Sequence, residues 1–167
     1  MESADILQTI AEIAMALAGF GGIAAGLGYR TRGEWSDDDQ IRLMGMAYTS
    51  LLVVFAALLP FVVHQLSDIV PWRVCALIVW PLQAYNLVSA LRVFRHGIPT
   101  AYNPVASILL LLAQLAAFAV LSVICSNLYI ESNFGLYLLA SVLILFVAAL
   151  LFYRLLSTSF KGGANAT

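Results

Sequence analysis

Residues 105–129, VASILLLLAQLAAFAVLSVICSNLY, contain no Asp, Glu, Lys or Arg. A helix of this length can cross a hydrocarbon core of about 30 Å. Comparable apolar stretches occur in four other parts of the chain, which is 62% hydrophobic and 10% charged. Soluble domains carry about 25% charged residues, because their surface faces water. We therefore expect an all-α, polytopic membrane protein that is embedded in a lipid bilayer and has no separate soluble domain.

Polar loops and helix breakers divide the chain into five expected helices. Pro71, Gly97, Pro99 and Pro104 mark loops. Ser36, with an acidic residue three positions later, is typical of a helix start. We expect a single transmembrane domain over residues 1–157 and a short polar cytoplasmic tail over residues 158–167. The expected helices cover residues 6–29, 37–66, 73–95, 105–129 and 134–156.

The positions of the cations predict the orientation in the membrane. Cytoplasmic loops of membrane proteins carry an excess of Lys and Arg. If the N-terminus lies outside, only Arg73 is left on the outer side. We therefore expect the N-terminus out and the C-terminus in, with Trp72 and Tyr137 at the outer membrane edge. The cations expected on the cytoplasmic side are Arg30, Arg32, Arg42, Arg92, Arg95, Arg154 and Lys161.

The first helix carries small residues every four positions, at Ala14, Ala18, Gly22 and Gly26. In lipid, small residues allow the close backbone approach that drives helix association. The pattern predicts either packing against the other helices of the chain or an oligomer interface, which includes the possibility of a pore-lining surface. The alternative that this helix lies flat at the membrane surface is disfavoured, because such helices usually have a basic polar face.

Glu12 is the one acidic residue placed inside an expected span. Ionisable groups within a bilayer are costly and are candidates for function. His64 lies at a similar depth in the second helix, and histidine changes its charge near neutral pH. A Glu12–His64 pair is a hypothesis for a proton or cation site, and an unpaired carboxylate near the membrane surface is the simpler interpretation.

Three uncharged amides, Gln83, Asn86 and Gln114, fall near the middle of the third and fourth helices. Such residues usually form hydrogen bonds between helices, although a permeation path or a ligand contact would use the same groups. Pro60 and Pro81 lie within spans. A proline there frees a backbone carbonyl on the preceding turn for another partner.

Several functions find no support in the sequence. No motif of a hydrolase, a metalloprotease or a phosphate-binding loop is present, so we expect neither an enzyme nor a cofactor, a metal or a nucleic-acid partner. Cys75 and Cys125 both fall near the outer side. Two free thiols are the simpler expectation, and a disulfide between them is the alternative. Nothing in the sequence favours a lipid-binding protein or a small-molecule sensor.

The segments AGFGGI at residues 18–23 and RTRGEWSDDDQIRL at residues 30–43 resemble a group of small bacterial multi-pass membrane proteins. These proteins share a Gly-Phe-Gly first helix, an Arg/Gly/Trp loop and an acid-capped second helix. The resemblance covers about the first 65 residues. It implies a location in the bacterial inner membrane and carries no implication for mechanism.

Two functions remain as expectations. The first is a homo-oligomeric assembly, including the case of an ion channel or pore formed between copies. The second is an accessory or anchor subunit that binds a larger membrane complex or a cytoplasmic protein. Arg32 and Trp35 in the first loop would provide its contact, although Trp35 is equally suited to anchoring at the membrane interface.

Overall fold

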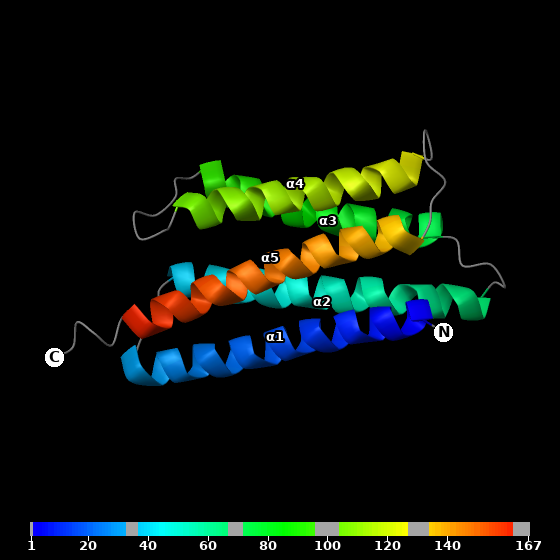
Figure 1. Cartoon of the computed structure of the whole chain (residues 1–167). Coiled ribbons are helices and arrows are strands. Elements are labelled where there is room, and N and C mark those ends of the chain that lie inside the picture. Colours follow the sequence, from blue (N-terminus) through cyan, green and yellow to red (C-terminus); the bar gives the residue numbers. More distant parts are fainter. Residues whose placement is uncertain (1, 33–36, 67–71, 96–103, 127–133, 162–167) are drawn as a thin grey trace.

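The structure, a computed structural model, describes residues 2–32, 37–66, 72–95, 104–126 and 134–161, and these ranges are helical. The five helices are α1 (Glu2–Arg32), α2 (Asp37–Leu66), α3 (Trp72–Arg95), α4 (Pro104–Ser126) and α5 (Phe134–Lys161). They run up and down in one bundle, so the two ends of the chain lie at opposite ends of it (Figure 1). Each helix is long and apolar enough to cross a membrane, which confirms the all-helical fold.

The C-terminal helix extends beyond the predicted boundary. The sequence predicts an end near residue 156 and a tail from residue 158, but α5 continues to Lys161. Neither glycine nor proline occurs between Leu156 and Lys161, whereas Gly162 and Gly163 follow directly. Glycine is the usual residue just after a helix end. The first glycine of the tail therefore predicts the end of α5 better than the polar composition of the tail does. Residues 162–167 lie outside the described ranges.

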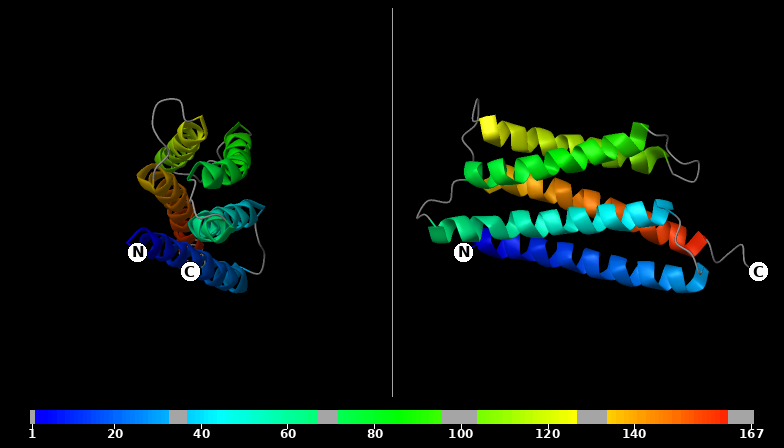
Figure 2. Two further views of the ribbon diagram at one scale, coloured as in Figure 1. Left: turned by 90° about the vertical axis from the view of Figure 1, so that its right-hand side faces the viewer. Right: turned by 180° about the vertical axis from the view of Figure 1, so that it is seen from behind.

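The bundle consists of two groups of helices, which are joined by α5 and by a smaller contact between α2 and α3. Helices α1 and α2 pack along each other, α3 packs on α4, and α5 contacts α1, α2 and α4. The end-on view in Figure 2 shows α3 and α4 on one side of α5, and α1 and α2 on the other. Helix α1 runs along the bundle beside α2 and α5 (Figure 1). This is the arrangement expected of a spanning helix, and the placement of α1 relative to the membrane surface stays a prediction.

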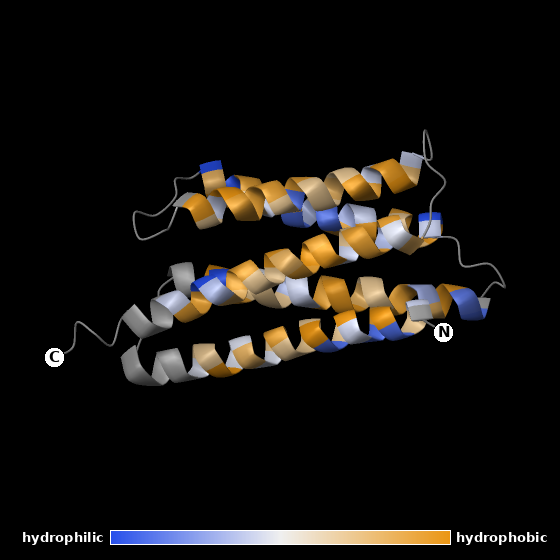
Figure 3. Ribbon diagram, in the orientation of Figure 1, coloured by the Kyte–Doolittle hydropathy of each residue, from blue (hydrophilic) through white to orange (hydrophobic). Residues whose placement is uncertain are grey.

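The core of the bundle contains many small side chains. Small residues let helix backbones approach closely where no hydrophobic effect separates lipid from protein. Large apolar side chains such as Phe20, Leu51, Leu112 and Phe146 instead point outward. Figure 3 shows this apolar character along most of the length of the helices. The described outer surface of the bundle is thus as apolar as its interior, as is expected of helices that span a membrane. The most deeply buried alanines are Ala14, Ala56, Ala57, Ala76, Ala117, Ala140 and Ala148.

Candidate functional site

Helix α1 has an exposed face, which carries polar residues near the N-terminal end of the helix and glycines further along it. Six exposed residues lie within about 80° of one another around the helix, given 100° per residue. A Cβ atom added to any of the three glycines among them would meet no atom within 4 Å. We call this surface the α1 outer face. It comprises Gln8, Glu12, Met15, Gly19, Gly22 and Gly26.

The predicted stripe of small residues divides between the core and this outer face. Ala14 is fully buried and Ala18 is half-buried, whereas Gly22 and Gly26 are exposed. Each four-residue step advances the position around an α-helix by about 40°. Three steps therefore carry the stripe about 120° from the core to the outside. The prediction of packing within the chain is correct for Ala14 and wrong for the two glycines.

Two other small residues take the place of those glycines in the core. Gly21 and Ala25 are buried, and a Cβ atom at Gly21 would collide with the side chain of Met46 on α2. The core face of α1 thus follows steps of three and four residues in alternation, which keeps it on one side of the helix. The spacing of small residues at every fourth position did not indicate this face. A hydrophobic period near 3.6 residues is the sequence signal for it.

The structure shows no direct bond between Glu12 and His64 in the described parts of the chain, and the proton or cation site proposed for them stays a prediction. Glu12 accepts a hydrogen bond from Nε2 of Gln8 at 2.9 Å, one turn earlier on the same helix. His64 is exposed at the end of α2, and no hydrogen bond or ion pair joins it to Glu12 in the described parts of the chain. The two residues lie at the same end of the bundle, but Glu12 belongs to the α1 outer face. Within those parts no group of three His, Cys, Asp or Glu residues could hold a metal ion.

The midplane amides form interhelical hydrogen bonds, as the sequence predicts. Nε2 of Gln83 on α3 donates to Oε1 of Gln114 on α4, and both residues are buried. Nδ2 of Asn86 approaches Oγ1 of Thr49 on α2 at 3.4 Å. These contacts link α3 to both of its neighbours near the middle of the bundle. They leave further polar atoms of Asn86 and Gln114 facing a cavity.

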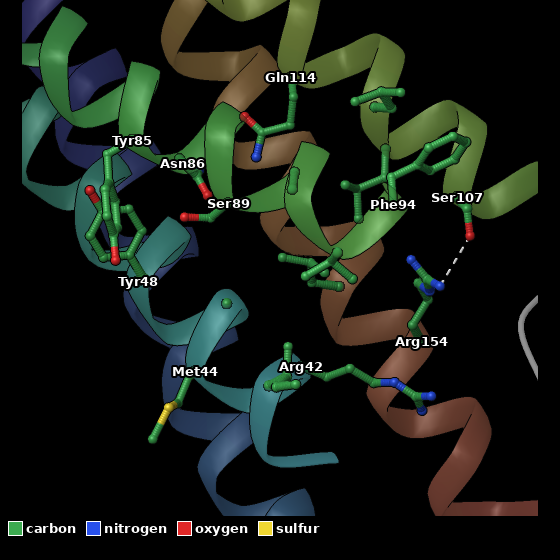
Figure 4. Close-up of a pocket in the computed structure, with 17 residues that line it drawn as sticks. Arg42, Met44, Tyr48, Tyr85, Asn86, Ser89, Phe94, Ser107, Gln114 and Arg154 are labelled. Atoms are coloured by element: carbon green, nitrogen blue, oxygen red, sulfur yellow. Dashed lines mark hydrogen bonds between the residues drawn. The ribbon is translucent and has the colours of Figure 1, made fainter. Parts of the chain in front are cut away.

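That cavity is a concave site with polar and charged residues in its lining. It has a volume of about 420 Å³ and lies between α2, α3, α4 and α5. Arg42 and Arg154 lie at one end, with Gln114, Asn86 and Ser89 at the other (Figure 4). Nη2 of Arg154 donates to Oγ of Ser107 at 3.2 Å. The remaining lining residues are mostly apolar, including Met44, Ala90, Val93, Leu110 and Leu111.

The sequence placed these two arginines only as cytoplasmic charges. Arg42 is in fact 7% exposed, and Arg154 is half-buried. Both lie inside the apolar spans of their helices, Gln40–Gln65 and Phe134–Ser157. An arginine within a span usually faces the protein interior, so this depth was a signal that sequence reasoning did not use.

Two further predictions concern residues at the other end and in the first loop. Cys75 is buried, Cys125 is half-buried, and both thiols are free. Tyr137 is buried against Trp72, with ring centroids 5.6 Å apart, and the membrane-edge position expected for both stays a prediction. Trp35 and the capping residue Ser36 lie outside the described residues, as does the side chain of Arg32. The partner contact proposed for that loop therefore stays a prediction.

Comparisons with known proteins give no family. No protein-family model, no curated protein and no solved structure matches the chain.

Proposed function

We propose that the protein acts as a homo-oligomeric assembly in the bacterial inner membrane, with its N-terminus outside and with copies meeting along the α1 outer face. The observation that carries this proposal is the open space beside Gly19, Gly22 and Gly26. Glycines in spanning helices permit a close approach of a second helix backbone. Gly21 provides this contact within the chain, and the other three glycines offer it to a second copy.

The polar end of the same face supports the proposal independently. Glu12 lies about 14 Å along the axis from the start of the span at Ser3, so a monomer exposes it within the lipid. An ionised side chain within a membrane span is costly unless it gains polar partners. A second copy of α1 would cover Glu12 and Gln8 and provide polar partners for them, which lowers that penalty.

Ion conduction is the activity that we propose for this assembly. A pore would form between copies, because the midplane amides of one copy are bonded to each other and to Thr49. The α1 outer face carries polar groups only at its outer end, at Gln8 and Glu12. A pore lined by this face would have one polar ring and an otherwise uncharged wall, and we therefore expect weak ion selectivity.

Native mass spectrometry of protein extracted gently from its own membrane tests the assembly. We expect one closed oligomer, and we expect Gly22→Leu to raise its dissociation constant about tenfold or more, which corresponds to about 1.4 kcal/mol. Ala119→Leu is the matched control, because Ala119 is also small and exposed but lies on α4, which does not contact α1. Flux of ions from liposomes then tests conduction by the same variants.

The accessory-subunit function is the other outcome of this measurement. A single copy that travels with larger foreign subunits would overturn the homo-oligomer. Trp35→Ala would then be expected to weaken capture of those subunits without changing the folding of the bundle. A monomer without partners would overturn both functions.

A further inference from the structure

The cavity between α2, α3, α4 and α5 is independent of the proposed assembly. Among the described residues, no part of α1 lines it. Its volume of about 420 Å³ falls within the range of about 300–1,000 Å³ that is typical of ligand sites. The failure of one proposal would therefore leave the other intact.

The charge of the lining selects an anionic ligand. Among the described residues that line it, Arg42 and Arg154 are the charged ones, and both are cations. Arg42 is more than nine-tenths buried. Arginine binds phosphate through two parallel hydrogen bonds, and such charge-assisted bonds are about twice as strong as neutral ones. A phosphate at this end would lie between guanidinium groups from two helices, near the hydroxyl of Ser107 (Figure 4).

The polar groups at the deeper end of the cavity lie far enough from the arginines to bind a second set of acceptor atoms on the same ligand. Ser107 and Gln114 are seven residues apart on α4, which corresponds to about 10 Å along the helix. Oε1 of Gln114 is occupied by Gln83, so the amide NH₂ of Gln114 remains a donor on the cavity side. Asn86 and Ser89 lie beside it (Figure 4). Ester carbonyl groups are acceptors that these donors can bind.

The rim of the cavity indicates where the ligand enters. Five lining residues are exposed, and all of them belong to α2 or α3. Higher along the two helices, the hydroxyl of Tyr48 donates to the carbonyl of Leu82 at 3.2 Å and joins them. The cavity therefore opens sideways between α2 and α3, on a side of the bundle that would face lipid if the helices span a membrane. The exposed rim residues are Ile41, Met44, Tyr85, Val93 and Phe94.

We infer that this cavity binds an anionic phospholipid. The phosphate contacts Arg42 and Arg154, the glycerol ester groups face Ser89, Asn86 and Gln114, and the acyl chains leave between α2 and α3 into the membrane. A zwitterionic lipid fits less well, because its ammonium group would lie near the guanidinium groups of Arg42 and Arg154. At the cytoplasmic leaflet, anionic headgroups are available at the depth of both arginines.

Binding of phosphatidylglycerol and phosphatidylcholine to the purified protein in detergent tests this inference. We expect native mass spectrometry to show a bound phosphatidylglycerol and at least about tenfold weaker binding of phosphatidylcholine, a difference of about 1.4 kcal/mol. Arg154→Gln should abolish the preference, and Arg154→Lys should keep most of it, because the charge remains. Arg92→Gln is the matched control, since Arg92 is exposed at the same end of the bundle but does not line the cavity.

A variant without a charge change separates occupation of the cavity from attraction by surface charge. Ala90→Leu adds volume to the lining and should weaken binding of phosphatidylglycerol while all arginines remain. Equal loss of binding in Arg92→Gln and Arg154→Gln would overturn the inference, because it would show general surface attraction. Unchanged binding in Ala90→Leu would overturn it as well. Displacement of the lipid by millimolar inorganic phosphate would show a site for free anions instead.

Discussion

The hydroxyl of Tyr137 donates to the backbone carbonyl of Ala56 at 2.7 Å. This carbonyl lies four residues before Pro60, which has no N–H group to bond it. Tyr137 on α5 thus supplies the hydrogen bond that the proline removes from α2. In a bilayer an unsatisfied backbone group costs several kcal/mol, so the two residues form a matched pair across the contact between α2 and α5.

Tyr137→Phe should therefore destabilise the bundle by about 1–2 kcal/mol, because the Ala56 carbonyl loses its partner. In a Pro60→Ala background the backbone N–H of residue 60 bonds that carbonyl. The same Tyr137→Phe change should then cost less than about 0.5 kcal/mol. Unfolding in mixed detergent micelles measures all four members of the cycle. Equal costs in the two backgrounds would contradict the pairing.

Gly21 and Gly22 should respond differently to the same substitution. Gly21→Leu should lower the free energy of unfolding by about 1–3 kcal/mol, because the new side chain collides with Met46 in the core. Gly22→Leu should leave the unfolding of the single copy almost unchanged, because nothing lies within 4 Å of its added Cβ. Parallel measurements of unfolding and of oligomer mass separate these effects. A large loss of monomer stability in Gly22→Leu would place that residue in the core instead.

Cysteine cross-linking provides a direct test of the α1 outer face. Gly26→Cys, in a protein whose Cys75 and Cys125 are replaced by alanine, should give a disulfide-linked dimer on mild oxidation. The same substitution at Ala119 on α4 should not. Gel electrophoresis without reducing agent reads out both variants. Equal cross-linking at the two positions would indicate random collision in the membrane rather than a defined interface.

The bond between Gln83 and Gln114 should make single substitutions more harmful than the double one. Gln114→Leu removes the acceptor and leaves the buried amide of Gln83 without its partner, at a cost of about 1–3 kcal/mol. Replacing both residues by leucine removes both polar groups and should recover much of that loss. Unfolding of the two single variants and the double variant gives the coupling energy. A double variant at least as unstable as the sum of the single ones would exclude the coupling.

Glu12 and His64 should behave independently of each other. Because Glu12 is bonded to Gln8 and His64 is exposed elsewhere, Glu12→Gln and His64→Ala should have additive effects on stability, within about 0.5 kcal/mol. Glu12→Gln should also alter the dissociation constant of the oligomer, since this residue lies on the α1 outer face, and His64→Ala should not. A coupling energy between the two substitutions well above about 0.5 kcal/mol would instead support a shared site.

The sequence by itself determined the number of helices, their approximate ends and their apolar character. Residues 105–129 are decisive because lipid imposes a single requirement, a long uncharged helix with its backbone bonded internally. The same local logic predicted hydrogen bonds for Gln83 and Gln114, and a freed carbonyl before Pro60. Each of these inferences depends on the requirements of one segment for hydrogen bonds and apolar character, and not on which helices surround it.

Only the tertiary structure decided which side of each helix faces a neighbour. Ala14 and Gly26 belong to one pattern in the sequence, yet one is buried and the other is exposed. Hydrophobicity does not mark the buried side in lipid, because the inside and the outside of the bundle are both apolar. For the same reason the cavity at Arg42 and Arg154 could not be predicted. The cavity depends on how four helices are placed relative to one another. Side-chain packing sets this placement, and it cannot be predicted from any single segment.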